Sequence, residues 1–304
     1  YIKKDLDDLN VEFSNWFHES ELVKDDFVYQ ILENIKSKDL SYVKDGAVWF
    51  RSTKYGDDKD RVLVRANGAL TYFATDIAYH SLKLDKYDYI INIWGSDHHG
   101  YVPRLTNALK GIGYDTNKIS IHLIQFANLY RDGEKMSMST RSGEFITLKS
   151  LVDEIGSDAI NFFYINKKIE QHLDFDINTA LSKDKDNPVY YIQYAHARIE
   201  KIISKVNLKD LDFDDTKLID PKEQDLLRLL NNYEETFSVA MDTLQPQMIT
   251  NYLYKLSQSF HSYYANIKII DDEINYSRVS LVIAIQKVLK NGLNLFDINA
   301  PEDM

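Results

Sequence analysis

The chain has 304 residues, 44% hydrophobic and 27% charged, as is typical of a globular protein with room for two domains. It contains no cysteine, which excludes disulfides and thiolate metal sites, and its formal charge of −11 excludes wholesale coating of nucleic acid. No apolar run approaches the roughly 20 residues that cross a membrane, so we expect a cytoplasmic protein with no membrane partner.

The first part of the chain is expected to be helical and then to form strands. Residues 1–45 carry apolar side chains near helical spacing. Two short stretches alternate as strands do, at 47–50 and 61–65. Asn67-Gly68 predicts a hairpin turn into a further strand at 70–73. The acidic stretch 56–60 (GDDKD) lacks the spaced ligands and final Glu of a calcium loop, which favours a solvated turn.

The middle of the chain has the pattern of a parallel sheet. A predicted helix, 74–84, precedes the apolar run Tyr89–Trp94, which predicts a strand buried on both faces. A helix at Pro103–Lys110 and a second strand at Ile119–Ile124 complete a strand–helix–strand unit. Ligands of such sheets bind at the carboxyl ends of the strands, where the polar stretch Gly95–Gly100 (GSDHHG) falls. We therefore predict a pocket there.

The last part of the chain is predicted to be helical. Ser157 is expected to cap a helix ending at Ile165, and Asn187 to cap one that runs to Val206. Three more helices are predicted, from the capping box Asp220–Glu223 to Met241, from Pro246 to Tyr264, and from Arg278 to Lys290 with a stop at Asn291-Gly292. The apolar stripes of these helices predict an α-helical bundle.

Eight stretches of the chain carry a family resemblance. They are, in order, DGAVWF, GDDKDRVLVRANG, TYFATDIAYH, NIWGSDHHGY, MSTRSGEF, HLDFD, NPVYYIQYAHARI and GLNLFDINAPEDM. Spread over nearly the whole chain, they resemble arginyl-tRNA synthetase, a class I aminoacyl-tRNA synthetase. The resemblance implies an α/β plus all-α fold. Residues 1–180 would be the later half of a Rossmann-like catalytic domain, with 1–45 as the helical tail of an insertion, and 181–304 an α-helical anticodon-binding domain.

One signature of class I synthetases does not occur in this sequence. No pair of histidines has the His-x-Gly-His spacing, and the chain begins with Tyr1 rather than methionine. We interpret the chain as the carboxyl-terminal portion of the enzyme, with an amino-terminal segment, covalent or separate, as a partner. We expect this fragment to be inactive alone and the protein to be a monomer.

The resemblance assigns binding of the arginine side chain to Tyr72, Asp76, Asp97 and His98. A carboxylate suits a guanidinium because it accepts two N–H donors of the planar fork. From the residues alone, Asp76 is equally well explained as an acid in the first turn of a helix, where the helix dipole favours it.

The stretch Gly95–Gly100 has three interpretations. In the family it lines the ATP pocket through Gly95, Asp97 and His99, with Asp97 accepting hydrogen bonds from ribose hydroxyls or the substrate amine. An Asp-His-His run also marks manganese phosphoesterases, but these need further acidic segments, and none stands at a suitable spacing. We therefore expect no metal site. The third interpretation is a capping turn without chemistry.

The charged loop Gly133–Gly143, after the second predicted strand, aligns with the mobile signature loop of class I synthetases. The usual Lys-Met-Ser-Lys reads Ser137-Met138-Ser139-Thr140 here, followed by Arg141, so both lysines are replaced. The resemblance puts Met138 and Ser139 beside ATP, and Ser139 with its backbone amides suits phosphate. The positive charge that steadies the leaving pyrophosphate would come from Arg141, Lys135 or the missing segment.

The resemblance also gives the bundle and the whole protein a function. Tyr191, Ala195, Tyr263 and Met304 would lie near anticodon bases, with ordinary packing as the alternative for each. The implied reaction joins arginine to tRNA(Arg), with ATP and its Mg²⁺ as a substrate and no tightly bound cofactor. The competing hypothesis is a tRNA-binding module without activity, and a metal-dependent phosphoesterase is less favoured.

Overall fold

The structure is a computed structural model that describes residues 2–136, 146–210, 213–271 and 273–304. Contacts within the chain divide it into two compact units. Residues 13–126 form one, here called the pocket unit, and residues 1–12 with 127–304 form the other, the bundle unit. Among the described residues no helix is long and apolar enough to cross a membrane. The predicted boundary at residue 180 separates a catalytic from an anticodon-binding domain. The division by contacts does not test it, so it stays a prediction.

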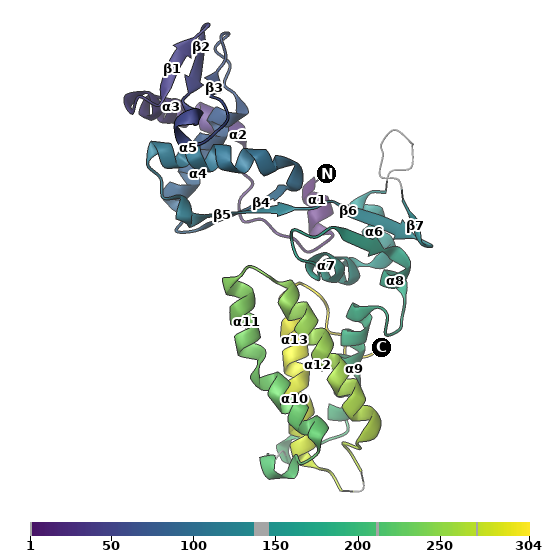
Figure 1. The fold of residues 1–304 in the computed structure, drawn as a ribbon. Coiled ribbons are helices and arrows are strands. Elements are labelled where there is room, and N and C mark those ends of the chain that lie inside the picture. Colours follow the sequence, from purple (N-terminus) through teal and green to yellow (C-terminus); the bar gives the residue numbers. More distant parts are fainter. Residues whose placement is uncertain (1, 137–145, 211–212, 272) are drawn as a thin grey trace. The chain divides into compact units, whose positions relative to one another are not determined.

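The pocket unit begins with two helices and a small antiparallel sheet, coloured purple and blue in Figure 1. The helices are α2 (Glu19–Lys24) and α3 (Phe27–Ser37), and the sheet has the order β1-β2-β3. Its strands are β1 (Ser41–Lys44), β2 (Ala47–Phe50) and β3 (Arg61–Val64), with the 3-10 helix η1 (Ser52–Tyr55) after β2. The helical prediction for 1–45 is therefore wrong for its last residues, which form β1.

The predicted strand at residues 70–73 does not form. Gly68 has a φ of +83° in the turn after β3, but only one bridge, Val64 to Leu70, continues the pairing. Thr71 then accepts a hydrogen bond from the backbone N–H of Ala74 and caps helix α4 (Tyr72–Lys86). Helix capping thus ends the hairpin early. As a result, Tyr72 and Asp76 lie one turn apart on the same helix, not across a strand–helix junction.

The strand–helix–strand unit is confirmed. Strand β4 (Ile90–Gly95) pairs in parallel with β5 (Ile119–Ile124), and α5 (Val102–Ile112) connects them, flanked by the 3-10 helices η2 (Ser96–Tyr101) and η3 (Thr116–Lys118). The prediction that β4 is buried on both faces is wrong. Its side chains alternate, with Ile90 and Asn92 buried but Ile91 and Ile93 exposed by 47% and 61%. Within this unit, described helices cover only one face of the pair.

A buried chain of hydrogen bonds joins α4 to β4. Lys83 Nζ donates to Asn92 Oδ1 at 2.8 Å, and the Asn92 amide donates to His80 Nε2 at 2.9 Å. His80 Nδ1 then donates to the backbone carbonyl of Asp76 at 2.8 Å. Burial and the nearby Lys83 charge lower the pKa of His80 to about 4, and burial lowers the pKa of Lys83 to about 8. A neutral His80 is required, because a protonated Nε2 could not accept from Asn92.

The acidic stretch 56–60 is a turn, as predicted, with Gly56, Asp58 and Lys59 exposed, but Asp57 and Asp60 are bound to neighbouring residues rather than solvated. Asp57 accepts hydrogen bonds from Arg61 Nε at 2.9 Å and Nη2 at 2.6 Å. Asp60 accepts from the backbone N–H and hydroxyl of Thr53 at 3.0 and 2.8 Å. The two carboxylates therefore fasten the loop to β3 and η1.

The bundle unit contains a second small sheet with the order β7-β6-β8. Strand β6 (Ala127–Arg131) pairs in parallel with β8 (Leu173–Asp176) and antiparallel with β7 (Glu134–Lys135). Residues 173–176 of the HLDFD stretch thus form a strand. Four short helices accompany the sheet, α1 (Ile2–Asp7), α6 (Leu148–Ile155), α7 (Ser157–Ile165) and α8 (Ile177–Leu181). Ser157 is the first residue of α7 rather than its cap, since Gly156 holds the cap position.

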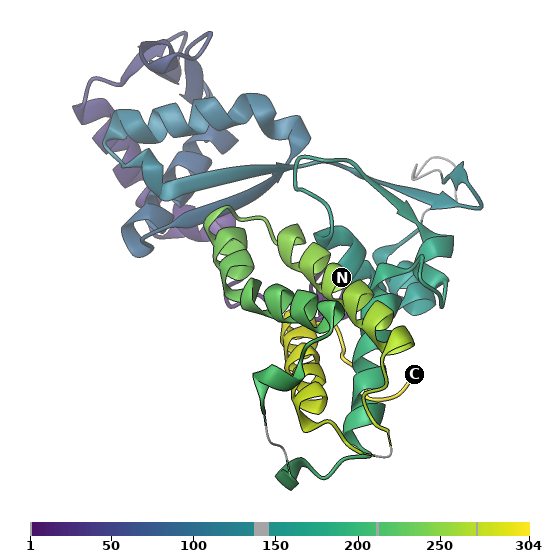
Figure 2. The same ribbon diagram turned by 60° about the horizontal axis from the view of Figure 1, so that its bottom comes forward.

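The remaining helices form the predicted bundle (Figure 2), in which α9, α12 and α13 pack side by side. They are α9 (Pro188–Ile203), α10 (Pro221–Asn231), α11 (Tyr233–Asp242), α12 (Gln247–Asn266) and α13 (Tyr276–Asn294), with 3-10 turns η4 (Leu208–Asp210) and η5 (Asp215–Lys217) between α9 and α10. Asn187 caps α9, and Asp220 and Glu223 form the predicted capping box. The apolar core of the bundle continues into residues of α7 and β8, such as Phe162 and Phe175.

Two helix predictions in the bundle need correction. The single helix expected up to Met241 ends at Asn231, and α11 starts after Asn232. Helix α13 continues past Gly292, which was expected to stop it. A Cβ on Gly292 would lie 2.5 Å from Leu253 Cδ2, so this glycine permits the close approach of α13 to α12.

Substitution of Gly292 tests that contact. The cost of overpacking, about 1–3 kcal/mol, opposes the roughly 1 kcal/mol that alanine gains over glycine in a helix. We expect Gly292→Ala to lower the free energy of unfolding by about 1 kcal/mol, measured by urea denaturation. In a Leu253→Ala background the same substitution should become stabilising. A stabilising effect in both backgrounds would contradict the proposed steric role.

The buried His80 predicts a dependence of stability on pH. Its pKa of about 4 in the folded chain lies below the ordinary 6.5, so the unfolded chain binds more protons between these values. This contribution, on the order of 3 kcal/mol, is complete above pH 6.5 and is lost as the pH falls toward 4. NMR titration of the His80 ring should give the low value directly, and His80→Gln should flatten that part of the stability profile. Titration near 6.5 would contradict the assignment.

Candidate functional site

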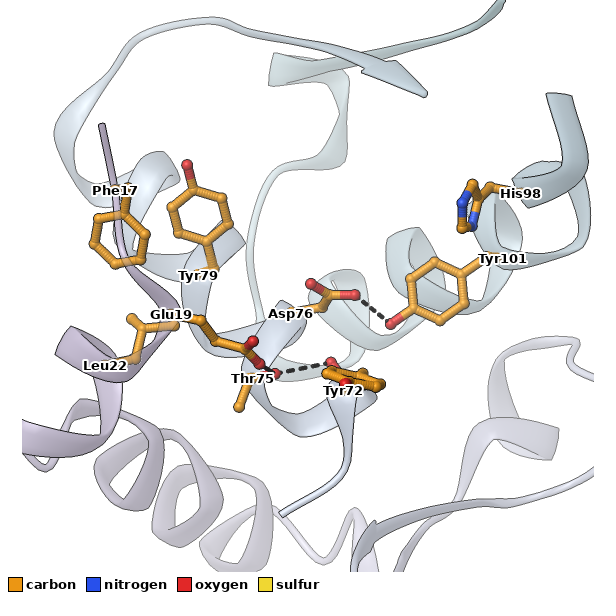
Figure 3. A pocket seen from close by; sticks show the side chains of 9 residues that line it. All are labelled: Phe17, Glu19, Leu22, Tyr72, Thr75, Asp76, Tyr79, His98 and Tyr101. Carbon is orange, nitrogen blue, oxygen red and sulfur yellow. Dashed lines mark hydrogen bonds between the residues drawn. The ribbon is translucent and has the colours of Figure 1, made fainter. Parts of the chain in front are cut away.

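A cavity of about 510 Å³ opens in the pocket unit beside α4 (Figure 3). Its walls come from α4, from α2 with the residues just before it, and from η2 at the carboxyl end of β4. The lining side chains are mostly aromatic, with two carboxylates among them: Phe17, Glu19, Leu22, Tyr72, Thr75, Asp76, Tyr79, His98 and Tyr101. The predicted pocket is therefore present, and three of the residues assigned to the arginine side chain, Tyr72, Asp76 and His98, line it.

Asp76 points into the cavity from the first turns of α4. Its Oδ2 accepts a hydrogen bond from the Tyr101 hydroxyl at 2.7 Å. The pKa of Asp76 is raised, chiefly by burial and further by the charge of Glu19, while the Tyr101 hydrogen bond, Lys83 and His98 act against this rise. The groups around Asp76 therefore disfavour its ionised form on balance, and a nearby cation would favour it.

Glu19 provides a second carboxylate that the sequence did not reveal. Its Oε1 accepts a hydrogen bond from Thr75 Oγ1 at 2.6 Å (Figure 3), although the two residues are 56 positions apart. Glu19 is also the first residue of α2, where an acid is expected for the helix dipole alone. No local pattern distinguishes these two roles.

Aromatic side chains frame the carboxylates. Phe17 stacks on Tyr79 with ring centroids 4.6 Å apart, and Lys83 Nζ lies 4.6 Å from the centroid of the Tyr79 ring. Tyr72 stands at the rim and is 78% exposed. Such faces attract cations, which suits a positively charged side chain with an apolar stem.

The polar residues after β4 lie at the carboxyl end of the strand, as predicted. His98 lines the cavity, whereas Asp97 and His99 are exposed and do not. Asp97 Oδ2 lies 3.8 Å from His98 Nε2. A Cβ added to Gly95 would lie 2.5 Å from Asp97 Oδ1, so this side chain packs directly against the glycine. Among the described residues no group of three or more His, Cys, Asp or Glu could hold a metal ion.

The free oxygens of the two carboxylates indicate what the cavity can bind. Thr75 occupies one oxygen of Glu19 and Tyr101 one of Asp76, while the other oxygen of each has no hydrogen bond from any described residue. Two acceptors in an aromatic cavity match a planar cation with several N–H donors. They repel an anionic group.

The predicted signature loop cannot be assessed from the structure. Met138, Ser139 and Arg141 lie outside the described residues. Lys135 is described, and it is exposed on β7, opposite Tyr130.

The bundle carries a cluster of aromatic side chains around Arg198. The Arg198 guanidinium lies 4.4 Å from the Tyr194 ring centroid and 4.8 Å from that of Tyr264, and its Nη2 donates to the Tyr194 hydroxyl at 2.5 Å. Tyr191 lies 4.4 Å from the His261 ring, and His261 lies 3.3 Å from Arg198 Nη1. Arginine beside partly exposed aromatic faces suits stacking with unpaired bases.

The structure corrects two of the four anticodon predictions. Ala195 and Tyr263 are completely buried, and the Tyr263 hydroxyl donates to the buried Glu223 at 3.1 Å, so neither offers a surface to a base. Tyr191 is partly buried, and Met304 is 40% exposed. The next residue along the helix, Tyr264, is 39% exposed and joins the cluster instead. Tyr263 and Tyr264 are adjacent on α12 and so face different sides of the helix, and the resemblance did not decide which of the two is exposed.

Two protein families match the chain. Residues 1–186 match the family described as tRNA synthetases class I (R), catalytic domain, and residues 192–304 match the DALR anticodon binding domain. Among curated relatives, the arginine–tRNA ligase of Vesicomyosocius okutanii is 46% identical over 306 residues, covering 100% of this chain and 54% of its own length. That of Hydrogenovibrio crunogenus is 45% identical over 313 residues, with 100% and 53% coverage. The chain thus spans about half the length of these relatives.

Solved structures agree with these matches. An arginyl-tRNA synthetase of Campylobacter jejuni superposes with a TM-score of 0.93 at 35% identity, covering 100% of this chain and 67% of its own. The methionyl-tRNA synthetase of Mycobacterium tuberculosis, in complex with methionyl-adenylate, has a TM-score of 0.72 at 10% identity, covers 97% of this chain and 75% of its own, and shares the fold alone. Sequence, family and structural matches together show that this chain belongs to the class I arginyl-tRNA synthetases.

Proposed function

We propose that the protein attaches arginine to tRNA(Arg) and that this chain supplies the arginine pocket and the anticodon-binding bundle. The arginine carboxylate attacks the α-phosphorus of MgATP, a substrate rather than a resident cofactor, to give arginyl-adenylate and pyrophosphate. A hydroxyl of the terminal tRNA ribose then takes the acyl group and releases AMP. The observation that carries the proposal is the pair of carboxylates, Asp76 and Glu19, in the aromatic cavity. A protein of translation would act in the cytoplasm, and we expect a monomer.

Arginine specificity follows from the charge of this cavity. One free oxygen from each carboxylate faces the guanidinium, and the aromatic rings of Tyr79 and Phe17 pack against its alkyl stem. A neutral side chain of the same shape would leave the partly buried Asp76 charge without a partner, which is unfavourable. Tyr72 closes the rim, and His98 stands between the cavity and the end of β4.

The nucleotide would bind next to this cavity, at the carboxyl end of β4. Gly95 allows close approach, Asp97 offers acceptors for ribose hydroxyls, and His99 is exposed on the same turn. The signature loop contributes Met138 and Ser139, with Arg141 or Lys135 as the cation that stabilises the leaving pyrophosphate. Positioning and charge stabilisation carry the catalysis, and no residue is assigned a covalent role.

The bundle would recognise the anticodon through the cluster around Arg198. Tyr191 and Tyr264 offer ring faces, and Arg198 supplies a cation held between two tyrosines. Met304 lies at an exposed position and is kept as a further contact. From Asn187 onward the sequence has 12 Lys and Arg against 17 Asp and Glu, so few phosphates are engaged. Binding should therefore be weak and depend only gently on salt.

The substitution Asp76→Asn tests the arginine pocket. We expect it to weaken binding of L-arginine to the chain about 30-fold or more, because one side of a largely desolvated charge pair is lost. Isothermal titration calorimetry measures the affinity, and L-citrulline, a neutral isostere, should not bind the wild type. Because burial raises the Asp76 pKa, arginine binding to the wild type should weaken with falling pH sooner than for an ordinary aspartate.

The matched control for this substitution is Asp85→Asn. Asp85 lies on the same helix but outside the cavity, where it accepts a hydrogen bond from Tyr114 at 3.1 Å. The substitution Asp85→Asn should leave the affinity for arginine unchanged. Equal binding of citrulline and arginine, or an unaffected Asp76→Asn chain, would contradict the assignment.

Anticodon recognition can be tested with RNA stem–loops. The chain should bind an arginine anticodon arm better than an arm with a changed middle base. Tyr264→Ala or Tyr191→Ala should lower this preference about fivefold or more, since stacking on an aromatic face contributes roughly 1–3 kcal/mol per base. Tyr29→Ala, at an exposed tyrosine of α3 in the pocket unit, serves as the control. Equal affinity for both arms, measured by fluorescence anisotropy on folded protein, would leave the bundle without this role.

A further inference from the structure

Tyr101 occupies a position that the reaction outlined above does not use. It is largely buried, with its ring 5.9 Å from that of Trp94 and 6.4 Å from that of Phe73. Its hydroxyl donates to Asp76 Oδ2 at 2.7 Å. Burial and the Asp76 carboxylate raise the pKa of Tyr101 far above its ordinary value. The phenol therefore keeps its proton and remains a donor to Asp76 at every pH at which the protein works.

An ion pair lies next to the Tyr101 ring. The Arg104 guanidinium lies 5.4 Å from the ring centroid, and its Nε lies 3.6 Å from Asp57 Oδ2. The Asp57 side chain is only 9% exposed and also binds Arg61, and its hydrogen bonds with Arg61 hold the pKa of Asp57 far below its ordinary value. Arg104 therefore stays between a permanently charged carboxylate and an aromatic face.

The acidic loop that supplies Asp57 is itself docked on α5, the helix that carries Arg104. Tyr55, just before the loop, packs against Gly111, which lies two turns after Arg104 on that helix. Together with the Asp57–Arg104 pair, this gives two contacts between the loop and one helix. The GDDKD stretch thus has a structural connection to the cavity, although none of its residues lines it.

We propose that Tyr101 is a positioning residue for arginine recognition, and that the Asp57–Arg104 pair fixes Tyr101 in the orientation that Asp76 requires. The ligand in this inference rests on the proposed function. By holding Oδ2, Tyr101 stops rotation of the Asp76 carboxylate and presents Oδ1 to the guanidinium. It also favours the ionised carboxylate, because its hydrogen bond is strongest to the charged form.

The other charged groups around Asp76 make this donor important. Glu19 on α2 repels the Asp76 charge, while Lys83 on α4 and His98 on η2 attract it. His80 is neutral and contacts only the Asp76 backbone. Among the described residues, Tyr101 alone donates a hydrogen bond to the Asp76 carboxylate. Removal of the hydroxyl should therefore raise the Asp76 pKa as well as free its rotation.

The test is Tyr101→Phe, which keeps the ring and its packing. We expect arginine affinity to fall about tenfold at pH 7, as for loss of one hydrogen bond to a charged group. The acid limb of the binding profile should move up by about one pH unit, because a hydrogen bond of that strength corresponds to roughly one unit of pKa. The control is Tyr114→Phe, which removes the same kind of hydrogen bond, to Asp85, away from the cavity.

A second pair of variants tests the support of Tyr101. Arg104→Met should reduce arginine affinity and shift the acid limb in the same direction as Tyr101→Phe, but by less, and Arg104→Lys should restore part of both. In the Tyr101→Phe background, Arg104→Met should have no further effect, because the two act on Asp76 through one hydroxyl. If the losses of arginine affinity in the two single variants added up in the double variant, Arg104 would not act through Tyr101, and this part of the proposal would be overturned.

One measurement separates this inference from the proposed function. In the absence of any ligand, ¹³C NMR titration of the Asp76 carboxyl should give a higher pKa in Tyr101→Phe than in the wild type, and an unchanged value in Tyr114→Phe. If wild-type protein failed to bind arginine while this shift appeared, the substrate assignment would fail and the positioning role would stand. An unchanged Asp76 pKa and an unchanged binding profile in folded Tyr101→Phe would overturn the inference.

Discussion

The central constraint in the pocket unit is the placement of two carboxylates in one aromatic cavity. Burial of Asp76 and the nearby charge of Glu19 both raise the pKa of Asp76, so the cavity disfavours a second full negative charge. Hydroxyl donors from Thr75 and Tyr101 offset part of this penalty, and Lys83 contributes a distant positive charge. A guanidinium would remove the rest. Two carboxylates in one cavity are thus electrostatically unfavourable in a way that a cation would relieve.

Much of the fold follows from local chemistry and could be predicted. Strand β5, helix α7, the cap at Asn187 and the capping box at Asp220 all depend on residues close in sequence. Errors arose where a local signal had two outcomes. Asn67-Gly68 makes a turn in either case, but Thr71 capping converts the expected strand into the start of α4. Gly292 resembles a helix stop, yet it serves close packing against Leu253.

The candidate site was predictable in part for the same reason. The position of His98 follows from the parallel strand pair, because the carboxyl ends of such strands gather ligands. Asp76, on α4, was assigned by the family resemblance instead. Glu19 meets Thr75 only through tertiary folding across 56 positions. Likewise, the charges of GDDKD look solvated in sequence, and only the structure brings Asp57 to Arg104. Long-range pairings of this kind leave no periodic trace in the sequence.

The shared use of the carboxylate oxygens has a consequence for redesign of this pocket. Each acid has one oxygen committed to a protein hydroxyl, Thr75 for Glu19 and Tyr101 for Asp76. Replacing an acid by its amide would therefore offer that hydroxyl either an oxygen or an NH₂ group, and the amide would orient its oxygen toward the donor. Its NH₂ group would then face the incoming side chain. A single acid-to-amide change thus converts one arm of the pocket from acceptor to donor, which suits a ligand with a carbonyl at that position.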